Sequence, residues 1–140
     1  MKMDEKTKNI VSMSPRLVCL STANKEGKPN VAVFGSLSLV DDETLMVALG
    51  DNRTFKNLSE NPYASCLIVN PDTRGLTMEG CRLYLKVKKI EDEGETLEKV
   101  RNVIREKYGD AAASIVKHVV YFEVEDIRPI VDLGGGDKSG

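Results

Sequence analysis

The residues best suited to chemistry in this chain lie in one short segment, residues 51–57, with the sequence DNRTFKN. The segment follows a strand-like apolar run, and Asp51 or Asn52 could cap a short helix that starts there. The first N–H groups of a helix lack intrahelical partners, and the helix dipole favours an anion at that end. Arg53 can bind two phosphate oxygens at once, and Thr54 adds a hydroxyl donor. The segment therefore predicts a phosphate site, although a solvated helix cap without a ligand would use the same residues.

A second candidate is Gly35, which interrupts the strand-like run of residues 30–40 (NVAVFGSLSLV). Glycine weakens a strand interior, so at such a place it marks either a bulge or the close approach of another group. Between Phe34 and Ser36, the bare backbone would let a flat ring lie against it. A flat surface beside the anion site of residues 51–57 is what a phosphorylated aromatic cofactor requires. A glycine bulge without a ligand remains the alternative.

Other sites of catalysis find little support in the sequence, which has no GxGxxG, GxxxxGK[ST] or HExxH motif. The glycines at 134–136 lack a preceding strand and a following helix, so we expect a flexible or ligand-facing tail rather than a phosphate loop. His118 is the only histidine, and a core or surface role is favoured over catalysis. The three cysteines form no CxxC pair, which predicts buried reduced thiols and no metal site, with a redox or nucleophilic cysteine as the alternative: Cys19, Cys66 and Cys81.

The composition is that of one globular domain covering residues 1–140, with 41% apolar and 30% charged residues. A net charge of −2 argues against a nucleic-acid partner, because the phosphates of a nucleic acid are bound by a protein surface rich in lysine and arginine. No apolar run approaches the ~20 residues that cross a bilayer. The charged beginning of the chain has no apolar signal segment, so we expect a cytoplasmic protein without a membrane partner.

The elements that must position these residues follow from hydrophobic periodicity. Runs of strand length and alternation predict six strands, at residues 16–22, 30–40, 44–49, 63–70, 76–91 and 119–127. Residues 93–108 form the clearest helix, with one apolar face of Leu97, Val100, Ile104 and Tyr108. Shorter helical stretches are expected at residues 4–13, near 51–60 and at 111–116. Successive strands with a late helix predict a mainly β fold, a six-stranded antiparallel barrel with flanking helices.

Three stretches together resemble a known family. They are LVCLSTANKEGKPNVAVFGS (17–36), DDETLMVALGDNRTFKNLSENPYASCLIV (41–69) and GLTMEGCRLYLKV (75–87). In this order and spacing they are similar to the FMN-binding split β-barrel proteins of the pyridoxamine 5′-phosphate oxidase-like superfamily, especially its short single-domain members. No single motif suffices, but their order covers most of the chain.

The resemblance implies a homodimer with two FMN sites at the subunit interface, each built from both chains. The residues it assigns to the FMN phosphate are Arg53 and Thr54, with Asn57 supporting them from the helix. Those it assigns to the isoalloxazine ring are Val33, Phe34, Gly35 and Ser36. Those it assigns to the ribityl side are Leu49, Gly50 and Asp51. Many relatives have lysine at the position of Thr54, so this chain is expected to rely more on backbone donors there.

The resemblance therefore implies an FMN-binding oxidoreductase or electron-transfer protein whose catalytic residues the sequence does not identify. True pyridoxamine phosphate oxidases carry C-terminal arginine and histidine residues for the substrate phosphate, and the ending VDLGGGDKSG has no counterpart. Oxidation of a B6 compound is thus not implied. The alternatives are a non-catalytic module that binds a deazaflavin or a haem, with His118 as the available axial ligand, and a structural protein that simply dimerises.

Overall fold

A computed structural model describes residues 1–134 of the chain, and these residues form seven strands, four α-helices and one 3-10 turn. The strands are β1 (Leu17–Ala23), β2 (Pro29–Val33), β3 (Ser38–Leu39), β4 (Thr44–Leu49), β5 (Tyr63–Val69), β6 (Gly80–Glu91) and β7 (His118–Pro129). The helices are α1 (Glu5–Ser12), α2 (Arg53–Glu60), α3 (Glu95–Tyr108) and α4 (Asp110–Ile115), with the 3-10 turn η1 at Gly75–Thr77. Of the predicted tail, residues 135–140 lie outside the described part.

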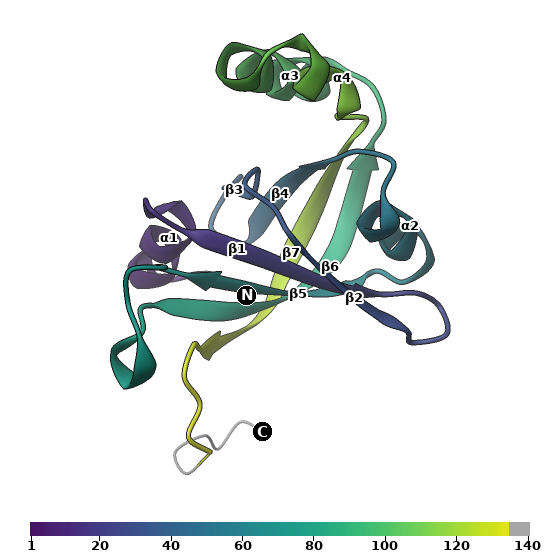
Figure 1. Cartoon of the computed structure of the whole chain (residues 1–140). Helices are drawn as coiled ribbons and strands as arrows, with labels where there is room; N and C mark the ends of the chain where they lie inside the picture. Colours follow the sequence, from purple (N-terminus) through teal and green to yellow (C-terminus); the bar gives the residue numbers. More distant parts are fainter. Residues whose placement is uncertain (135–140) are drawn as a thin grey trace.

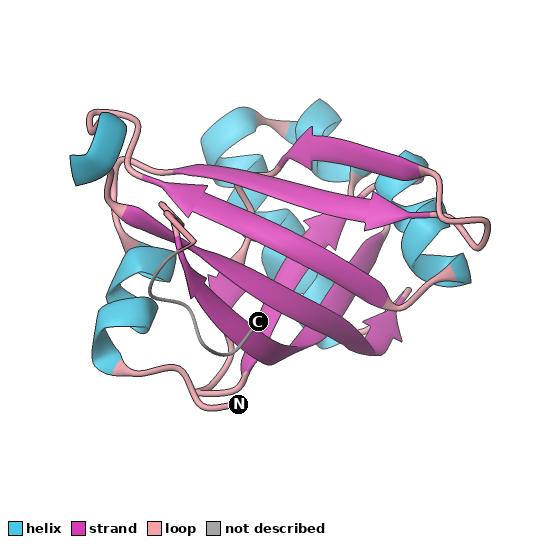
Figure 2. Cartoon of the chain, turned by 90° about the horizontal axis from the view of Figure 1, so that it is seen from below, coloured by secondary structure: helices cyan, strands magenta, loops and turns pink. Residues whose placement is uncertain are grey.

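All seven strands belong to one antiparallel sheet in the order β2-β1-β5-β6-β7-β4-β3. The sheet curls back on itself around an apolar core, and the helices lie at its rim (Figure 2). The long strands β6 and β7 form its middle. α3 and α4 sit together at the end of the sheet where β6 ends and β7 begins (Figure 1). The predicted fold class, mainly β with flanking helices, is confirmed.

The strand count differs because the single strand predicted at residues 30–40 is two strands. β2 pairs with β1 and β3 pairs with β4, so the two lie at opposite edges of the sheet. Residues 34–37 carry the chain from one edge to the other. The alternation of apolar and polar residues continues through this crossing, which is why periodicity alone predicts one uninterrupted strand.

Arg16 holds the crossing from the side of α1. Its guanidinium group donates hydrogen bonds to the carbonyl oxygens of Gly35 (3.0 Å) and Leu37 (2.7 Å), and also to that of Val11 at the end of α1. The planar fork of arginine presents five N–H donors on three nitrogens, so it can reach several separated acceptors at once. One side chain thus satisfies carbonyl groups that leave the sheet ladder where the chain changes edges.

The crossing is also fastened to both edges of the sheet. The backbone N–H of Phe34 donates to the carbonyl of Val18 in β1 at 3.0 Å. The hydroxyl of Ser36 accepts from the N–H of Ala48 in β4 and donates to its carbonyl, both at 3.1 Å. The hydroxyl of Ser36 therefore makes the hydrogen bonds to Ala48 that the backbone of a neighbouring strand would otherwise make. These bonds fix the position of the backbone around Gly35.

The expected helices are present, with bounds close to those predicted. Asn52 caps α2, and Gly109 (φ 94°) ends α3 in a left-handed conformation. On the predicted apolar face of α3, Leu97 is fully buried, whereas Tyr108, its last residue, is 75% exposed and lines the groove beside the helix. The helix ends at Tyr108, where the turn at Gly109 already directs the chain into α4. Within residues 1–134 no helix is long and apolar enough to span a membrane.

Candidate functional site

The predicted anion site lies where β4 ends and α2 begins. The side chain of Asn52 caps the helix, its Oδ1 accepting the N–H of Phe55 at 2.9 Å. The N–H groups of Arg53 and Thr54, in the first turn, have no acceptor within the helix. Arg53 is exposed and forms no hydrogen bond or ion pair with the described residues. Its guanidinium group is therefore available for an anion at this helix end.

Arg53 lies between two shallow hollows of the surface. One, of about 450 Å³, is lined by residues 51–53 with Phe55 and Lys56. The other, of about 470 Å³, lies between α2 and the β1–β2 turn, and its cations are Lys25, Lys28, Arg53 and Lys56. Glu26 and Glu60 also line the second hollow, so its charge is positive on balance. This part of the surface suits a phosphorylated ligand.

Three of the predicted site residues support this surface from beneath. Thr54 is 2% exposed, and Leu49 is 1% exposed within the main core. The side-chain N–H of the buried Asn57 donates to the hydroxyl of Thr22 at 3.1 Å, which fastens α2 to β1. Thr54 and Leu49 thus lie beneath the predicted anion site and do not form its surface, whereas Asn57 also lines the hollow between α2 and the β1–β2 turn.

Gly50 is required by a close approach within the chain. A Cβ atom at this position would lie 2.8 Å from the carbonyl oxygen of Ile115, at the end of α4. Because real Cβ atoms do not approach backbone oxygen so closely, a larger residue would push the start of the 50–52 turn away from α4. Gly50 thus sets the position of that turn.

The predicted flat surface lines a groove of about 790 Å³ between the crossing and the α3–α4 pair. All four expected residues, 33–36, line it together with Arg16. The opposite wall carries apolar and cationic side chains of α3, among them Val103 and Lys107. A Cβ atom built on Gly35 would meet nothing within 4 Å, so the backbone here is open to a neighbouring group. The groove therefore combines a bare backbone strip with an apolar wall, as a flat ring system requires.

The two halves of the predicted site do not form one hollow within a single chain. The groove contains residues 33–36, whereas Asp51 and Arg53 line the hollows near α2. They are connected through β4, because Ser36 is bonded to Ala48 and the next residues lead into the 50–52 turn. The sequence prediction thus located two neighbouring surfaces, and the tertiary structure separates them along the end of β4.

One cluster beside the site was not predicted as such. His118, at the start of β7, lies with Nε2 2.6 Å from Oδ1 of Asp51 and Nδ1 2.6 Å from Oδ1 of Asp92. The ring of Phe55 stacks on the imidazole, with a centroid distance of 3.5 Å and an interplanar angle of 2°. These contacts join residues 26 and 67 positions apart, so no local sequence pattern indicates them. Arg16 was missed for the same reason.

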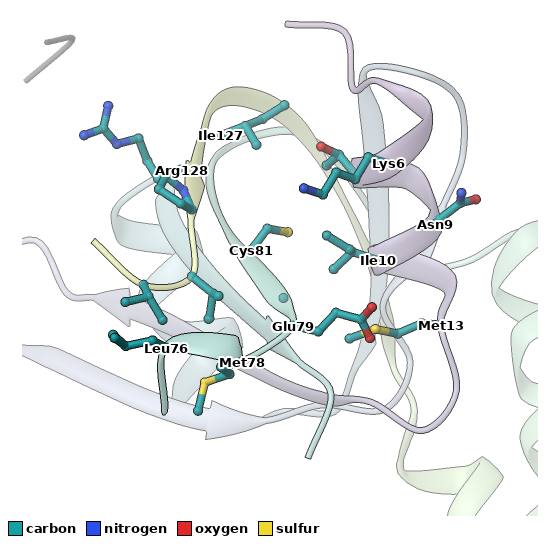
Figure 3. A pocket seen from close by; sticks show the side chains of 15 residues that line it. Lys6, Asn9, Ile10, Met13, Leu76, Met78, Glu79, Cys81, Ile127 and Arg128 are labelled. Atoms are coloured by element: carbon teal, nitrogen blue, oxygen red, sulfur yellow. The ribbon is translucent and has the colours of Figure 1, made fainter. Parts of the chain in front are cut away.

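A further hollow of about 960 Å³ lies away from these residues, between α1, the η1 region and the end of β7 (Figure 3). Figure 3 shows the thiol of Cys81 and the side chain of Ile10 directed into it. Most of its lining is apolar, and Leu76 on its rim is 76% exposed. It contains none of the residues that the sequence predicts for a cofactor.

The cysteines are free thiols, as predicted, although Cys19 is only half-buried. Burial raises the pKa of Cys66 to about 12 and that of Cys81 to about 11, because a thiolate is poorly solvated in the core. At pH 8 we therefore expect a thiol reagent to modify at most Cys19 in the folded protein and all three cysteines in denaturant. Rapid modification of two or more thiols in the folded protein would contradict this burial.

The same pKa shifts imply a loss of stability in alkali. The pKa values of Cys66 and Cys81 are raised above the ordinary value of 9.0, so the unfolded chain loses these protons first. The contribution of these two thiols to the free energy of unfolding is therefore fully present below about pH 9. It is lost as the pH rises toward 11 and 12. Thermal melting across this range measures the effect.

Comparison with solved structures shows the same fold in several proteins. An FMN-binding protein from Syntrophomonas wolfei is similar with a TM-score of 0.78 and 22% identity, over 92% of this chain and 86% of that one. A protein described as an F420 reductase gives a TM-score of 0.67 at 15% identity, over 89% and 98% of the two chains. HutZ, the haem storage protein of Vibrio cholerae, gives a TM-score of 0.60 at 18% identity, over 94% and 93%. At these identities the likeness concerns the fold alone.

Sequence comparison gives two further matches. The chain is 29% identical over 137 residues to the uncharacterized protein MJ0282 of Methanocaldococcus jannaschii, covering 94% of this chain and 82% of that protein. Residues 3–130, which include every predicted site residue, match the family model described as pyridoxamine 5′-phosphate oxidase. The curled antiparallel sheet, the cationic start of α2 and this match over most of the sequence lead to one conclusion: the chain belongs to the pyridoxamine 5′-phosphate oxidase family.

Proposed function

We propose that this protein binds FMN and acts as a flavin-dependent oxidoreductase or electron-transfer protein. The observation that carries the proposal is Arg53 at the start of α2, which forms no hydrogen bond or ion pair with the described residues. It lies five residues after Ala48, the residue of β4 to which Ser36 fastens the backbone strip. In this arrangement Arg53 and the first-turn N–H groups bind the phosphate. Bound FMN supplies the transfer of electrons or hydride, and the protein supplies its position and its hydrogen bonds.

The residues of the groove fit the ring of such a cofactor. The open backbone at Gly35 allows a planar ring to approach closely, and the neighbouring N–H and C=O groups can hydrogen-bond its edge. Val33 and the apolar side chains of α3 would cover the ring faces and limit the access of water. Asp51 and the 50–52 turn would lie along the ribityl chain, between the ring and Arg53.

We also propose that the working unit is a homodimer that completes these sites. Directly paired residues of neighbouring strands share a face of the sheet, and Val31, Ser21, Ser65 and Tyr84 form such a row on the outer face. Val31 is 67% exposed, and Val33, two residues along on the same face, is 64% exposed. Exposed apolar side chains that lie next to one another on one face, as Val31 and Val33 do, are typical of interaction surfaces. Since Val33 also lines the groove, a second copy seated here would adjoin the cofactor.

The structure favours a flavin over a haem. A haem bound through histidine would need a free imidazole nitrogen as axial ligand, and His118 is the only histidine of the chain. Both of its ring nitrogens face carboxylate oxygens at 2.6 Å, and Phe55 covers one ring face. Ligation of iron would require the loss of one of these contacts.

The proposal is tested by titrating FMN into the purified protein and following visible absorption and flavin fluorescence. We expect one FMN per chain, bleaching of the bound flavin on reduction, and a mass in solution of twice the 15.4 kDa chain. Riboflavin, which lacks the phosphate, should bind much more weakly. Gly35→Ala should lower FMN affinity because its methyl group occupies the ring position, while the apo-protein melts at an unchanged temperature. No binding at a large excess of FMN would refute the proposal.

A further inference from the structure

The hollow of about 960 Å³ between α1, η1 and the end of β7 has no part in the proposed cofactor site. It lies where the sheet stops being continuous. The pairing of β6 with β7 ends at Cys81 and Pro129, and Pro129 has no N–H group for a further ladder bond. Residues 130–131 and the η1 turn line the hollow from one side, and α1 lines it from the other (Figure 3). The described chain thus leaves an unfilled space at this end of the sheet.

The interior of this hollow is apolar down to the core. Ile10 and Cys81, which Figure 3 shows directed into it, are 8% and 4% exposed and belong to the main core cluster. Met13 is half-buried and packs against the same cluster, whereas Leu76 on the rim stays exposed. The rim also carries polar side chains, among them Asn9. Contiguous apolar surface in a hollow with a polar rim is typical of a ligand site.

One cation of the hollow is available to a ligand. Lys6, in the first turn of α1, is exposed and forms no hydrogen bond or ion pair with the described residues. Figure 3 shows its amino group directed across the hollow. Of the other charged residues of the lining, Arg128 lies 3.9 Å from the carboxylate of Asp132. Glu79 accepts a side-chain N–H of Asn70 at 3.1 Å. Lys6 therefore offers an ammonium group beside apolar surface, with no carboxylate of the described chain in contact with it.

We propose that this hollow is a binding site for an aliphatic carboxylate, whose chain lies against Ile10, Met13 and Cys81 and whose carboxylate lies at Lys6. The site contains none of the residues proposed for FMN and does not depend on them. An ammonium group next to apolar surface favours a ligand with one negative charge at the end of an apolar body. The charge pairs with Lys6, and the body displaces water from the apolar wall. A neutral ligand of the same shape gains only the second contribution.

The side chains of the lining favour an aliphatic body over a flat ring. None of the described residues that line the hollow is aromatic, so a ring would find no partner for stacking there. Met13 at the end of α1 and Met78 after η1 have flexible side chains that adapt to the shape of an alkyl chain. Burial raises the pKa of Cys81 to about 11, so at neutral pH it is an uncharged thiol that offers apolar surface. The proposed binding is therefore non-covalent.

The test uses octanoate and its neutral analogue octanamide, and it follows the ¹³C-methyl NMR signals of the five methionines. Met13 and Met78 line the hollow, while Met46 lines the groove proposed for the flavin ring. We expect octanoate to shift the signals of Met13 and Met78, to saturate at one ligand per chain, and to leave Met46 unchanged. Octanamide should bind about threefold more weakly, as expected for the loss of one exposed ion pair.

The length of the ligand tests the apolar contribution separately. Each further methylene group buried against the wall should lower the Kd by up to about fourfold. Decanoate is therefore expected to bind more tightly than octanoate, and hexanoate more weakly, with the same methionine signals shifted by all three.

Two exposed side chains distinguish the two contributions by mutation. Lys6→Gln is expected to weaken octanoate about threefold and to leave octanamide unchanged. Its matched control is Lys117→Gln, at an exposed lysine just before β7, which should behave as the wild type. Leu76→Ser should weaken both ligands by about fivefold, because it removes apolar surface from the rim. Its control is Val40→Ser, in the turn before β4 and outside the hollow. All four side chains are exposed, so unchanged melting temperatures are expected.

Equal Kd values for octanoate and octanamide in the wild type would overturn the proposal, as would an unchanged Kd for octanoate in Lys6→Gln. Shifts of Met46 in place of Met13 and Met78 would put the ligand in the groove and overturn it as well. Signals of Met13 and Met78 that move with protein concentration in the absence of ligand would show that a second copy covers the hollow, which also overturns it. FMN binding is measured independently of these titrations, so the failures of the two proposals are distinguishable.

Discussion

Replacing Arg53 with alanine is expected to weaken FMN binding by about 100-fold and to leave the stability of the protein nearly unchanged. Hydrogen bonds to charged groups contribute about 1.5–3 kcal/mol each, and a factor of 100 corresponds to about 2.8 kcal/mol. Arg53 is exposed and has no partner among the described residues, so its removal leaves no buried group unsatisfied. Fluorescence titration gives the affinity, and the melting temperature of the apo-protein gives the stability.

The matched control is Arg74→Ala, which removes the same charge from another exposed position, at the start of η1. Its FMN affinity should stay within about twofold of the wild type, since a distant surface charge is screened by salt. Riboflavin distinguishes the role of Arg53 further, because a lost phosphate contact cannot weaken a ligand without phosphate. Equal losses for FMN and riboflavin in Arg53→Ala would place the phosphate elsewhere.

Gly80→Ala is expected to destabilise the protein by about 3 kcal/mol, which corresponds to a fall in melting temperature of roughly 10 °C. Gly80 begins β6 and pairs with Val69 of β5. A Cβ atom there would lie 2.1 Å from the carbonyl oxygen of Ile68 and 3.0 Å from the Cα of Val69. Both are backbone atoms of a paired strand, so the clash is relieved only by parting β5 from β6.

Gly35→Ala is the control for this prediction, because its Cβ atom would meet nothing within 4 Å. The φ angle of Gly35 lies outside the left-handed region, so alanine is tolerated there and stability should change by less than about 1 kcal/mol. The two variants make the same chemical change at one crowded and one open position. Similar melting temperatures for both would show that β5 and β6 can separate at Gly80 without cost.

Much of the fold follows from local sequence patterns. The strand β4 has the bounds predicted from its apolar run, and α2 begins after Asn52 and α3 ends at Gly109, as capping preferences indicate. These features depend on neighbours within a few residues, so a single sequence carries the information. The candidate anion site was found in the same way, because Arg53 and its helix cap are adjacent in the chain.

Features that depend on distant contacts were predicted incorrectly or not at all. The run of residues 30–40 has the periodicity of one strand, yet it divides at Gly35 because the sheet curls and its two edges must be joined. Arg16 and Ser36 stabilise this crossing through partners elsewhere in the sequence. The side chains of Thr54 and Leu49 have types that suit a ligand site or a core, and only packing decides that they are buried.

By itself, then, the sequence determined the class of fold, the order of the elements and the two segments that carry the candidate site, since each follows from local periodicity, capping and turn residues. The family was indicated separately, by the resemblance of three stretches of the sequence to known proteins. The tertiary structure decided which of those residues reach the surface, how the crossing joins β2 to β3, and that His118 meets Asp51 and Asp92. Contacts between residues so far apart in the sequence depend on the curvature of the whole sheet. This curvature results from the pairing of all the strands together and is not encoded at any one position.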